Sequence, residues 1–135
     1  MLPTFTYGQV WSLRDVPGSI NVNNEHLIAI ITDIGKSLYK FGIRCFVMIN
    51  AHLGNMVAIK EAARKLYDEH RDLKVYYFIY PGVGEITKKV RESKPMPGGY
   101  FHACEIETSY MLYLAPEHVR MEKAVDDFPS TAGGF

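Results

Sequence analysis

Long apolar runs, a leader segment and a metal-type cysteine motif are all missing from this sequence. No stretch reaches the ~20 apolar residues that cross a bilayer, so a membrane span is not expected. The first eight residues, MLPTFTYG, lack a basic segment followed by an apolar core, and a secretory signal peptide is not expected either. The two cysteines, Cys45 and Cys104, form no CxxC motif, which argues against a zinc knuckle and fits a reducing cytoplasm.

An excess of charge of either sign is also missing. Lysine and arginine number 15 and aspartate and glutamate number 15, so a broad basic surface for nucleic acid is not expected. With 135 residues, 47% hydrophobic and 22% charged, the chain has the composition of one globular domain over residues 1–135. The small, Gly-rich segment 130–135 is predicted to be poorly ordered.

Apolar periodicity predicts alternating strands and helices. Residues 43–49 are nearly all apolar or β-branched, which is typical of a strand buried on both faces in a parallel sheet. The alternation predicts an α/β fold, a three-layer α/β/α sandwich with a mostly parallel sheet. The predicted strands are 3–7, 43–49 and 74–80, and the predicted helices are 24–41, 55–70, 85–91 and a segment that begins near Glu107.

The loop after the strand at 43–49 is the first candidate site. In an open α/β sheet, ligands bind beyond the carboxyl ends of the strands, and His52 lies there. Asn50 and Asn55 flank this histidine, and their side chains are suited to fixing a turn and orienting a neighbouring ligand. The alternative interpretation is that His52 only caps the next helix.

A second cluster, HACEIETS at 102–109, carries further donors. Together with His52, its residues His102, Glu105 and Glu107 supply imidazole nitrogen and carboxylate oxygen, which suit zinc, manganese or iron(II). The spacing is not specific, because HExxH is absent, and ordinary polar loop residues remain the alternative.

Other chemistry has weaker support. Ser109 and Cys104 could be nucleophiles, but the sequence shows no partnering base. The loop at 81–84, PGVG, lacks the full GxGxxG of a dinucleotide-binding loop.

Four segments, in this order and spacing, resemble the creatininase family. YGQVWSLRDVPGSINV at 7–22 is similar to the family's YGxSxEHxxFPGTISL, and DIGKSLYKFGIR at 33–44 to its DIGRSLARHGFR. NAHLGN at 50–55 resembles NGHGGN, and HACEIETSYMLYLAPEHVRM at 102–121 resembles HAGExETSLMLAL.P.LVRM. The resemblance extends over nearly the whole chain.

The resemblance implies a metal-dependent hydrolase of C–N bonds in small amides. It implies that His52 is a metal ligand and that Glu107 is a ligand or a supporting carboxylate at the same zinc, manganese or iron centre. It further implies that His102 is a catalytic histidine that polarises the carbonyl or protonates the leaving nitrogen, with Glu105 as a further acidic catalytic residue. Family members also form oligomers, so a homo-oligomer is expected.

Two departures from the family pattern bear on activity. The family carries a Glu-x-His pair and a bridging Asp on a strand and loop that would precede Tyr7, and this chain lacks that segment. Where the family has Glu-His after YGxSx, this chain has Ser12 and Leu13. Creatininase itself has a carboxylate at the position of Gly54, so creatinine is not the expected substrate.

Three hypotheses remain open at this point. The first is a creatininase-type amidohydrolase that is incomplete as this chain. The second is a catalytically inactive homologue that serves as a binding or assembly subunit. The third, from the fold alone, is a small nucleotide or sugar-phosphate binder, which the missing glycine loop disfavours.

Overall fold

The computed structural model describes residues 1–93 and 103–125. The chain divides into two compact units, Met1–Pro81 and Gly82–Phe135, and each is described by itself. In the described part of the chain, no helix combines the length and the apolar character that a membrane span requires. The predicted disorder of 130–135 concerns residues outside the described ranges, and the single domain over 1–135 stays a prediction.

The first unit is a β–α–β arrangement preceded by a helix. Strands β1 and β2 pair in parallel, with register from Cys45 opposite Lys74 to Asn50 opposite Ile79. These two strands are the whole sheet in the part of the chain that the structure describes. The elements are α1 (Asn24–Lys40), β1 (Cys45–Asn50), α2 (Met56–Glu69) and β2 (Lys74–Ile79), which confirms the predicted helices and two of the three predicted strands to within one or two residues.

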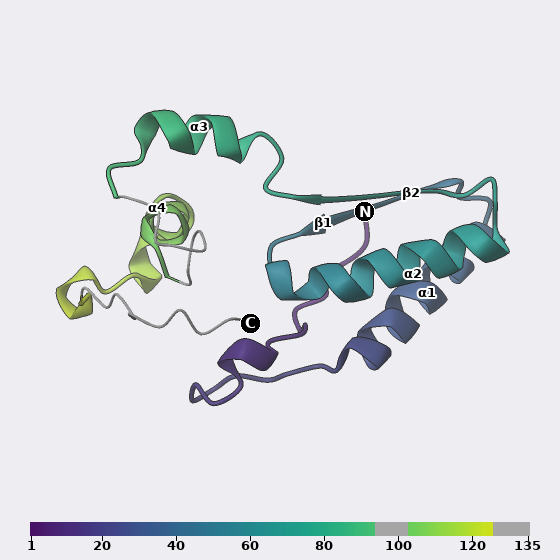
Figure 1. Cartoon of the computed structure of the whole chain (residues 1–135), viewed down its shortest axis with the longest axis horizontal. Helices are drawn as coiled ribbons and strands as arrows, with labels where there is room; N and C mark the ends of the chain where they lie inside the picture. The colour runs from purple at the N-terminus through teal and green to yellow at the C-terminus, as the bar shows by residue number, and fades with distance from the viewer. Residues whose placement is uncertain (94–102, 126–135) are drawn as a thin grey trace. The chain divides into compact units, whose positions relative to one another are not determined.

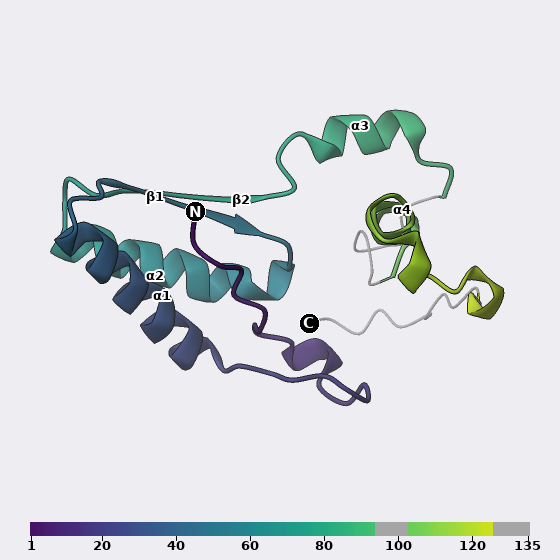
Figure 2. The ribbon, with the colours of Figure 1, turned by 180° about the vertical axis from the view of Figure 1, so that it is seen from behind.

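Both helices lie on one side of the strand pair, as the two opposite views show (Figure 1, Figure 2). Leu66 of α2 is fully buried and packs against Gly35 of α1. The two helices can approach closely here because glycine has no side chain. The most buried apolar residues come mainly from α2 and the turn that follows it: Ala58, Ile59, Ala62, Leu66 and Leu73. The amphipathic pattern of α2 therefore places its core as expected.

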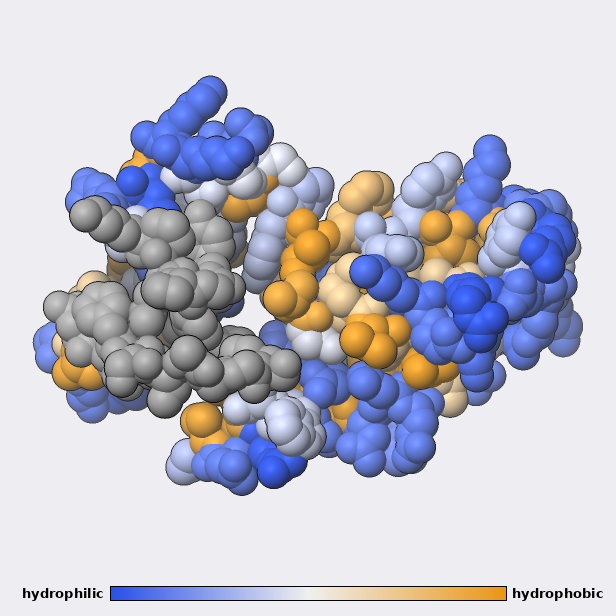
Figure 3. Space-filling view, in the orientation of Figure 1, coloured by the Kyte–Doolittle hydropathy of each residue, from blue (hydrophilic) through white to orange (hydrophobic). Residues whose placement is uncertain are grey.

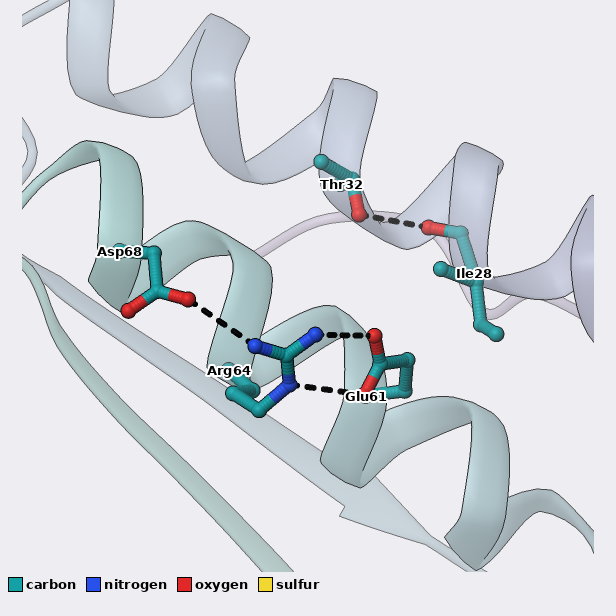
Figure 4. A network of polar contacts seen from close by, with 5 residues as sticks. All are labelled: Ile28, Thr32, Glu61, Arg64 and Asp68. Atoms are coloured by element: carbon teal, nitrogen blue, oxygen red, sulfur yellow. Dashed lines mark hydrogen bonds and ion pairs between the residues drawn. The ribbon is translucent and has the colours of Figure 1, made fainter.

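The opposite side of α2 is solvated and charged, as its sequence predicts. Arg64 donates hydrogen bonds to Glu61 one turn earlier and to Asp68 one turn later (Figure 4). Such pairs at i,i+3 and i,i+4 stabilise a helix by a few tenths of a kcal/mol each (about 0.2–0.5). They are surface features and carry no sign of a site.

The strand predicted at 3–7 is wrong. Residues 1–7 form no strand and are all exposed, and the chain here makes only an isolated parallel bridge between Gly8 and Asn21. A strand needs a neighbour for its backbone groups, and none of the described strands extends to this segment. In addition, Pro3 has no backbone N–H to donate to a neighbouring strand.

The prediction that β1 is buried on both faces is also wrong in this structure. Exposure alternates along the strand, and Cys45, Val47 and Ile49 are exposed, the last at 83%. The helices of the first unit cover only the other face. Apolar side chains therefore reach the surface between hydrophilic ones, which Figure 3 shows for one face of the molecule.

The second unit contains two α-helices in its described part, α3 (Val83–Val90) and α4 (Glu105–Leu114). Gly82, with φ of 79°, supplies the left-handed residue before α3. Pro116 starts a short 3-10 helix, Pro116–His118. Helices together with a parallel strand pair agree with the predicted α/β class.

Candidate functional site

The carboxyl end of β1 is shaped by a turn centred on Asn50. This side chain is buried, with 6% of its surface exposed. Its Oδ1 accepts from the backbone N–H of His52 at 3.2 Å, and its Nδ2 donates to the His52 carbonyl at 2.7 Å. Asparagine is suited to this role because its short amide can bond backbone two residues ahead. The predicted turn-fixing role of Asn50 is confirmed.

Asn55 links this turn to the N-terminal segment. Its Nδ2 donates to Asn50 Oδ1 at 3.1 Å, and its Oδ1 accepts from the backbone N–H of Gln9 at 2.9 Å. Gly8 leaves room for this contact, because a Cβ there would lie 2.5 Å from Asn55 Oδ1. Segments about 46 residues apart are therefore joined beside His52.

Two polar atoms converge over Gly54. A Cβ at this position would lie 2.5 Å from both Gln9 Oε1 and His52 Nε2, and 2.8 Å from the Gln9 carbonyl oxygen. Real Cβ atoms do not approach other atoms so closely. Gly54 therefore creates the space in which the Gln9 carboxamide and the His52 imidazole lie next to each other.

A further hydrogen bond reaches the same loop from the residue that follows β2. The hydroxyl of Tyr80, the residue after β2, donates to the carbonyl of Ala51 at 2.6 Å. The backbone on both sides of His52 is thus bonded by side chains from Asn50 and Tyr80. The imidazole itself is half-buried at the end of β1.

Glu105, at the start of α4, is a second well-ordered polar centre. Its two oxygens accept the backbone N–H groups of Glu92 at 3.0 Å and of Ser93 at 2.7 Å. Arg91 Nε lies 4.0 Å away. Hydrogen bonds from Ser93 and Glu92, with the Arg91 charge beside them, lower the pKa of Glu105 to about 2. The group is therefore a fixed anion near neutral pH.

Glu107 lies two residues further into the helix and makes a different set of contacts. Its Oε2 accepts the backbone N–H of Ala103 at 2.7 Å, which satisfies a donor just before the helix begins. Ala103 itself has φ of 53°. His102, the predicted catalytic histidine, lies outside the described residues.

The second unit also has an apolar groove of about 180 Å³ between α3 and α4. Ser109, one of its lining residues, is exposed, and its hydroxyl has no hydrogen-bond partner among the described residues. Cys104 precedes α4 as its N-cap. Neither side chain makes a hydrogen bond to a base in the described part of the chain, so the structure adds no support for a nucleophile.

The described residues do not assemble a complete metal site. Within residues 1–93 and 103–125, no three histidine, cysteine, aspartate or glutamate side chains are grouped closely enough to hold an ion. Protein zinc sites of the catalytic type use about three such ligands plus water. His52 belongs to the first unit, whereas Glu105 and Glu107 belong to the second, each in its own network.

The chain matches the creatininase family model, described as creatinine amidohydrolase, over residues 1–135. The chain belongs to the creatininase family. Three curated proteins illustrate its range. The mycofactocin precursor peptide peptidase of Mycobacterium tuberculosis is 31% identical over 91% of this chain and 42% of its own length. The 3-dehydro-scyllo-inosose hydrolase of Thermotoga maritima is 28% identical over 84% of this chain and 37% of its own length. The creatinine amidohydrolase of Pseudomonas putida is 30% identical over 85% and 47%.

Solved creatininase structures share the fold. A crystal structure of creatinine amidohydrolase superimposes with a TM-score of 0.82 at 26% identity, covering 98% of this chain and 56% of that one. A structure described as creatininase with Mn gives 0.78 at 26% identity, over 98% and 57%. This creatininase-family chain spans less than half the length of the three curated relatives named above. The creatininase-like α/β fold is confirmed.

Two residues of the His52 loop were not anticipated from sequence. Gln9 lies in the first family-like motif, directly after Tyr7-Gly8, but nothing in that motif predicts its contact with Asn55. The sequence predicts Tyr80 as the last residue of a strand, whereas β2 ends at Ile79 and Tyr80 belongs to the turn that Pro81-Gly82 indicates. Neither contact has a local signal, because each partner lies about thirty residues or more away in sequence.

Proposed function

We propose that this chain contributes part of a hydrolytic site of the creatininase type, acting on a C–N bond of a small amide. Family membership supports this proposal, because the relatives named above are described as an amidohydrolase, a peptidase and a hydrolase. The observation that carries it is the loop after β1, where Asn50, Asn55 and Tyr80 hold the His52 backbone and Gly54 keeps the space beside its Nε2 free of a side chain.

In this proposal His52 is an imidazole ligand for a divalent zinc, manganese or iron ion, and Glu107 is a carboxylate donor. Structures described as creatininase with Mn and of Zn–Zn type support a divalent metal in the family. His102 is proposed as the catalytic histidine. Because no three such donors are grouped among the described residues, the site as described does not fit a tightly held ion.

Glu105 is given a different role from the catalytic one predicted from sequence. Both of its oxygens accept backbone N–H groups, and its pKa of about 2 makes it a poor proton donor or acceptor near neutral pH. We therefore assign Glu105 to positioning. It ties residues 92–93 to the start of α4, the helix that carries Glu107.

The second candidate is a catalytically inactive homologue that serves as a binding or assembly subunit. The absence of a three-donor group from the described part of the chain favours it. The two candidates differ in whether His52 binds metal at all. A small-molecule partner, a homo-oligomer and a cytoplasmic location stay predictions under both.

Calorimetric titration of the full chain with zinc and with manganese tests the proposal. We expect weak binding that His52→Ala abolishes and that His26→Ala, a change at an exposed histidine of α1, leaves intact. Binding that is insensitive to His52→Ala would refute the ligand role and favour the inactive homologue. Tight, stoichiometric binding that depends on His52 would support the ligand role and contradict the expected weakness.

A further inference from the structure

Tyr80 has a backbone conformation that its residue type disfavours. Its φ is 44°, in the left-handed region, where a side chain with a Cβ is uncommon. The following residue, Pro81, restricts the conformation of Tyr80 further. Such conformations persist only where surrounding contacts impose them, and they gather at functional sites.

The contact that accompanies this conformation is the hydrogen bond to Ala51. Tyr80 follows β2, and the Ala51 carbonyl follows β1, at the carboxyl end of each paired strand. The Tyr80 hydroxyl donates to this carbonyl at 2.6 Å. Ala51 shares its peptide group with His52, so the bond acts on the backbone that carries the imidazole.

This bond complements the turn made by Asn50. Asn50 bonds the N–H and the carbonyl of His52, and the backbone N–H of Asn55 also donates to the same carbonyl at 3.2 Å. The carbonyl of Ala51 is the remaining polar group of this peptide unit, and Tyr80 bonds it. Three polar backbone groups next to the His52 Cα, its own N–H and carbonyl and the Ala51 carbonyl, are therefore each bonded by a neighbour.

We propose that Tyr80 is a positioning residue that fixes the orientation of His52. Its hydroxyl, rather than its buried area, carries this role, because Tyr80 is 37% exposed. The bond lets β2 hold the loop after β1 in one conformation, in which the imidazole lies beside Gln9 over Gly54. The proposed function enters this inference only as the identity of the ligand that His52 binds. The ordering of the loop by Tyr80 does not require a metal.

The test compares Tyr80→Phe with Tyr76→Phe in the full chain. Tyr76 lies on β2 and is 47% exposed, and its hydroxyl has no partner among the described residues, so it is a matched control. NMR measures the His52 ring signals, assigned by their loss in His52→Ala, and amide hydrogen exchange at His52. Thermal unfolding of each variant measures the fold as a whole.

We expect Tyr80→Phe to shift or broaden the His52 ring signals and to speed exchange at the His52 amide about tenfold. Tyr76→Phe is expected to match the wild type, and both variants should keep similar unfolding midpoints. Unchanged His52 signals in Tyr80→Phe would overturn the proposal. Equal changes in both variants, or changes spread over all core amides with a lower midpoint, would also overturn it.

A further measurement needs only the wild-type chain. Slow exchange of the Tyr80 hydroxyl proton, seen in its ring carbon signals, is expected if the bond to Ala51 persists in solution. Fast exchange would overturn the proposal even if Tyr80→Phe does not fold. The two proposals can fail separately. If zinc binding persists in every variant, including His52→Ala, while the NMR result is as expected, the metal role of His52 is refuted and the positioning role of Tyr80 stands.

Discussion

Asn55 Nδ2 donates a hydrogen bond to Asn50 Oδ1 across the turn that carries His52. The same Asn55 side chain accepts from Gln9, so one amide joins the loop after β1 to the N-terminal segment. Both bonds are partly buried. Removing this amide leaves a donor and an acceptor without their partner in a region with little water.

Asn55→Ala should therefore lower the free energy of unfolding by about 1–3 kcal/mol, the cost of partly buried polar groups left unsatisfied. Urea denaturation measures this change. Amide exchange at Gln9 should rise at the same time, because its N–H loses the acceptor. Asn23→Ala, which removes an exposed side-chain bond to Asn21, serves as the control and should cost less than about 1 kcal/mol. Equal costs for the two variants would contradict the role of Asn55.

Gly54→Ala tests the space between Gln9 and His52. The new methyl would lie 2.8 Å from a Gln9 backbone oxygen, which cannot swing aside as a side chain does. We expect a loss of about 1–3 kcal/mol of stability and a displaced His52 signal by NMR. Leu53→Ala, in the same turn but exposed, should leave the His52 signal in place. If the His52 signal of Gly54→Ala matches that of the wild type and stability is unchanged, the loop admits the methyl and the prediction is wrong.

Local pattern was sufficient for most elements of the first unit. The run at 43–49 and the amphipathic residues of α1 and α2 predicted their elements because each signal lies within one segment. The strand at 3–7 failed for the opposite reason. Strand formation depends on a partner, and β-propensity within five residues contains no information about one.

The candidate site divides in the same way. Asn50 could be predicted to fix the turn because its partner, His52, lies two residues away. The bonds from Gln9 and Tyr80 could not, since they join distant segments and neither residue type is specific to such a contact. Glu105 was predicted from a motif, whereas its engagement by residues 92–93 follows only from the fold of the second unit.

The exposed face of β1 and β2 leads to a prediction of self-association. Val47 and Ile49 lie opposite Tyr76 and Phe78, and all four side chains are exposed. Parallel sheets are normally covered on both faces. Among the described residues, each of the two strands also has one edge without a neighbouring strand, and such an edge can pair with another chain. We expect a second copy of this chain to cover them, so light scattering should give more than the mass of one chain.

Ile49→Lys should shift that distribution toward the monomer, because a charge on this face resists burial. Val57→Lys places the same charge on the exposed side of α2 and should leave the distribution unchanged. A monomeric wild type at working concentration would rule out the prediction.

The pH dependence of stability should report on Asp72. Tyr39 donates to its Oδ1 at 2.8 Å and Arg44 to its Oδ2 at 2.9 Å, and these contacts, the Tyr39 bond foremost, lower the pKa of Asp72 below its ordinary 3.8. A lowered folded-state pKa means that the contribution is present above about pH 4 and is lost as pH falls toward the folded value.

The stability difference between wild type and Asp72→Asn should therefore be constant from pH 7 to about pH 5 and shrink below about pH 4. Urea midpoints at several pH values measure it. Asp15→Asn, whose carboxylate is almost fully exposed and 3.9 Å from Arg14, should show little difference at any pH. A difference that grows as pH falls would have the wrong sign for this carboxylate.

The same substitution at two helical glycines should have opposite effects. At Gly35 of α1, a new methyl would lie 2.5 Å from Cδ1 and 2.7 Å from Cδ2 of Leu66, which is fully buried and has no room to rotate away. Overpacking costs about 1–3 kcal/mol and outweighs the roughly 1 kcal/mol that alanine gains over glycine in a helix. At Gly84 of α3, nothing lies within 4 Å of the new methyl, so only the gain remains. Thermal and urea unfolding should show that Gly35→Ala is less stable than the wild type and that Gly84→Ala is more stable. If Gly35→Ala is instead stabilising, α1 and α2 can separate to admit the methyl, and the prediction is wrong.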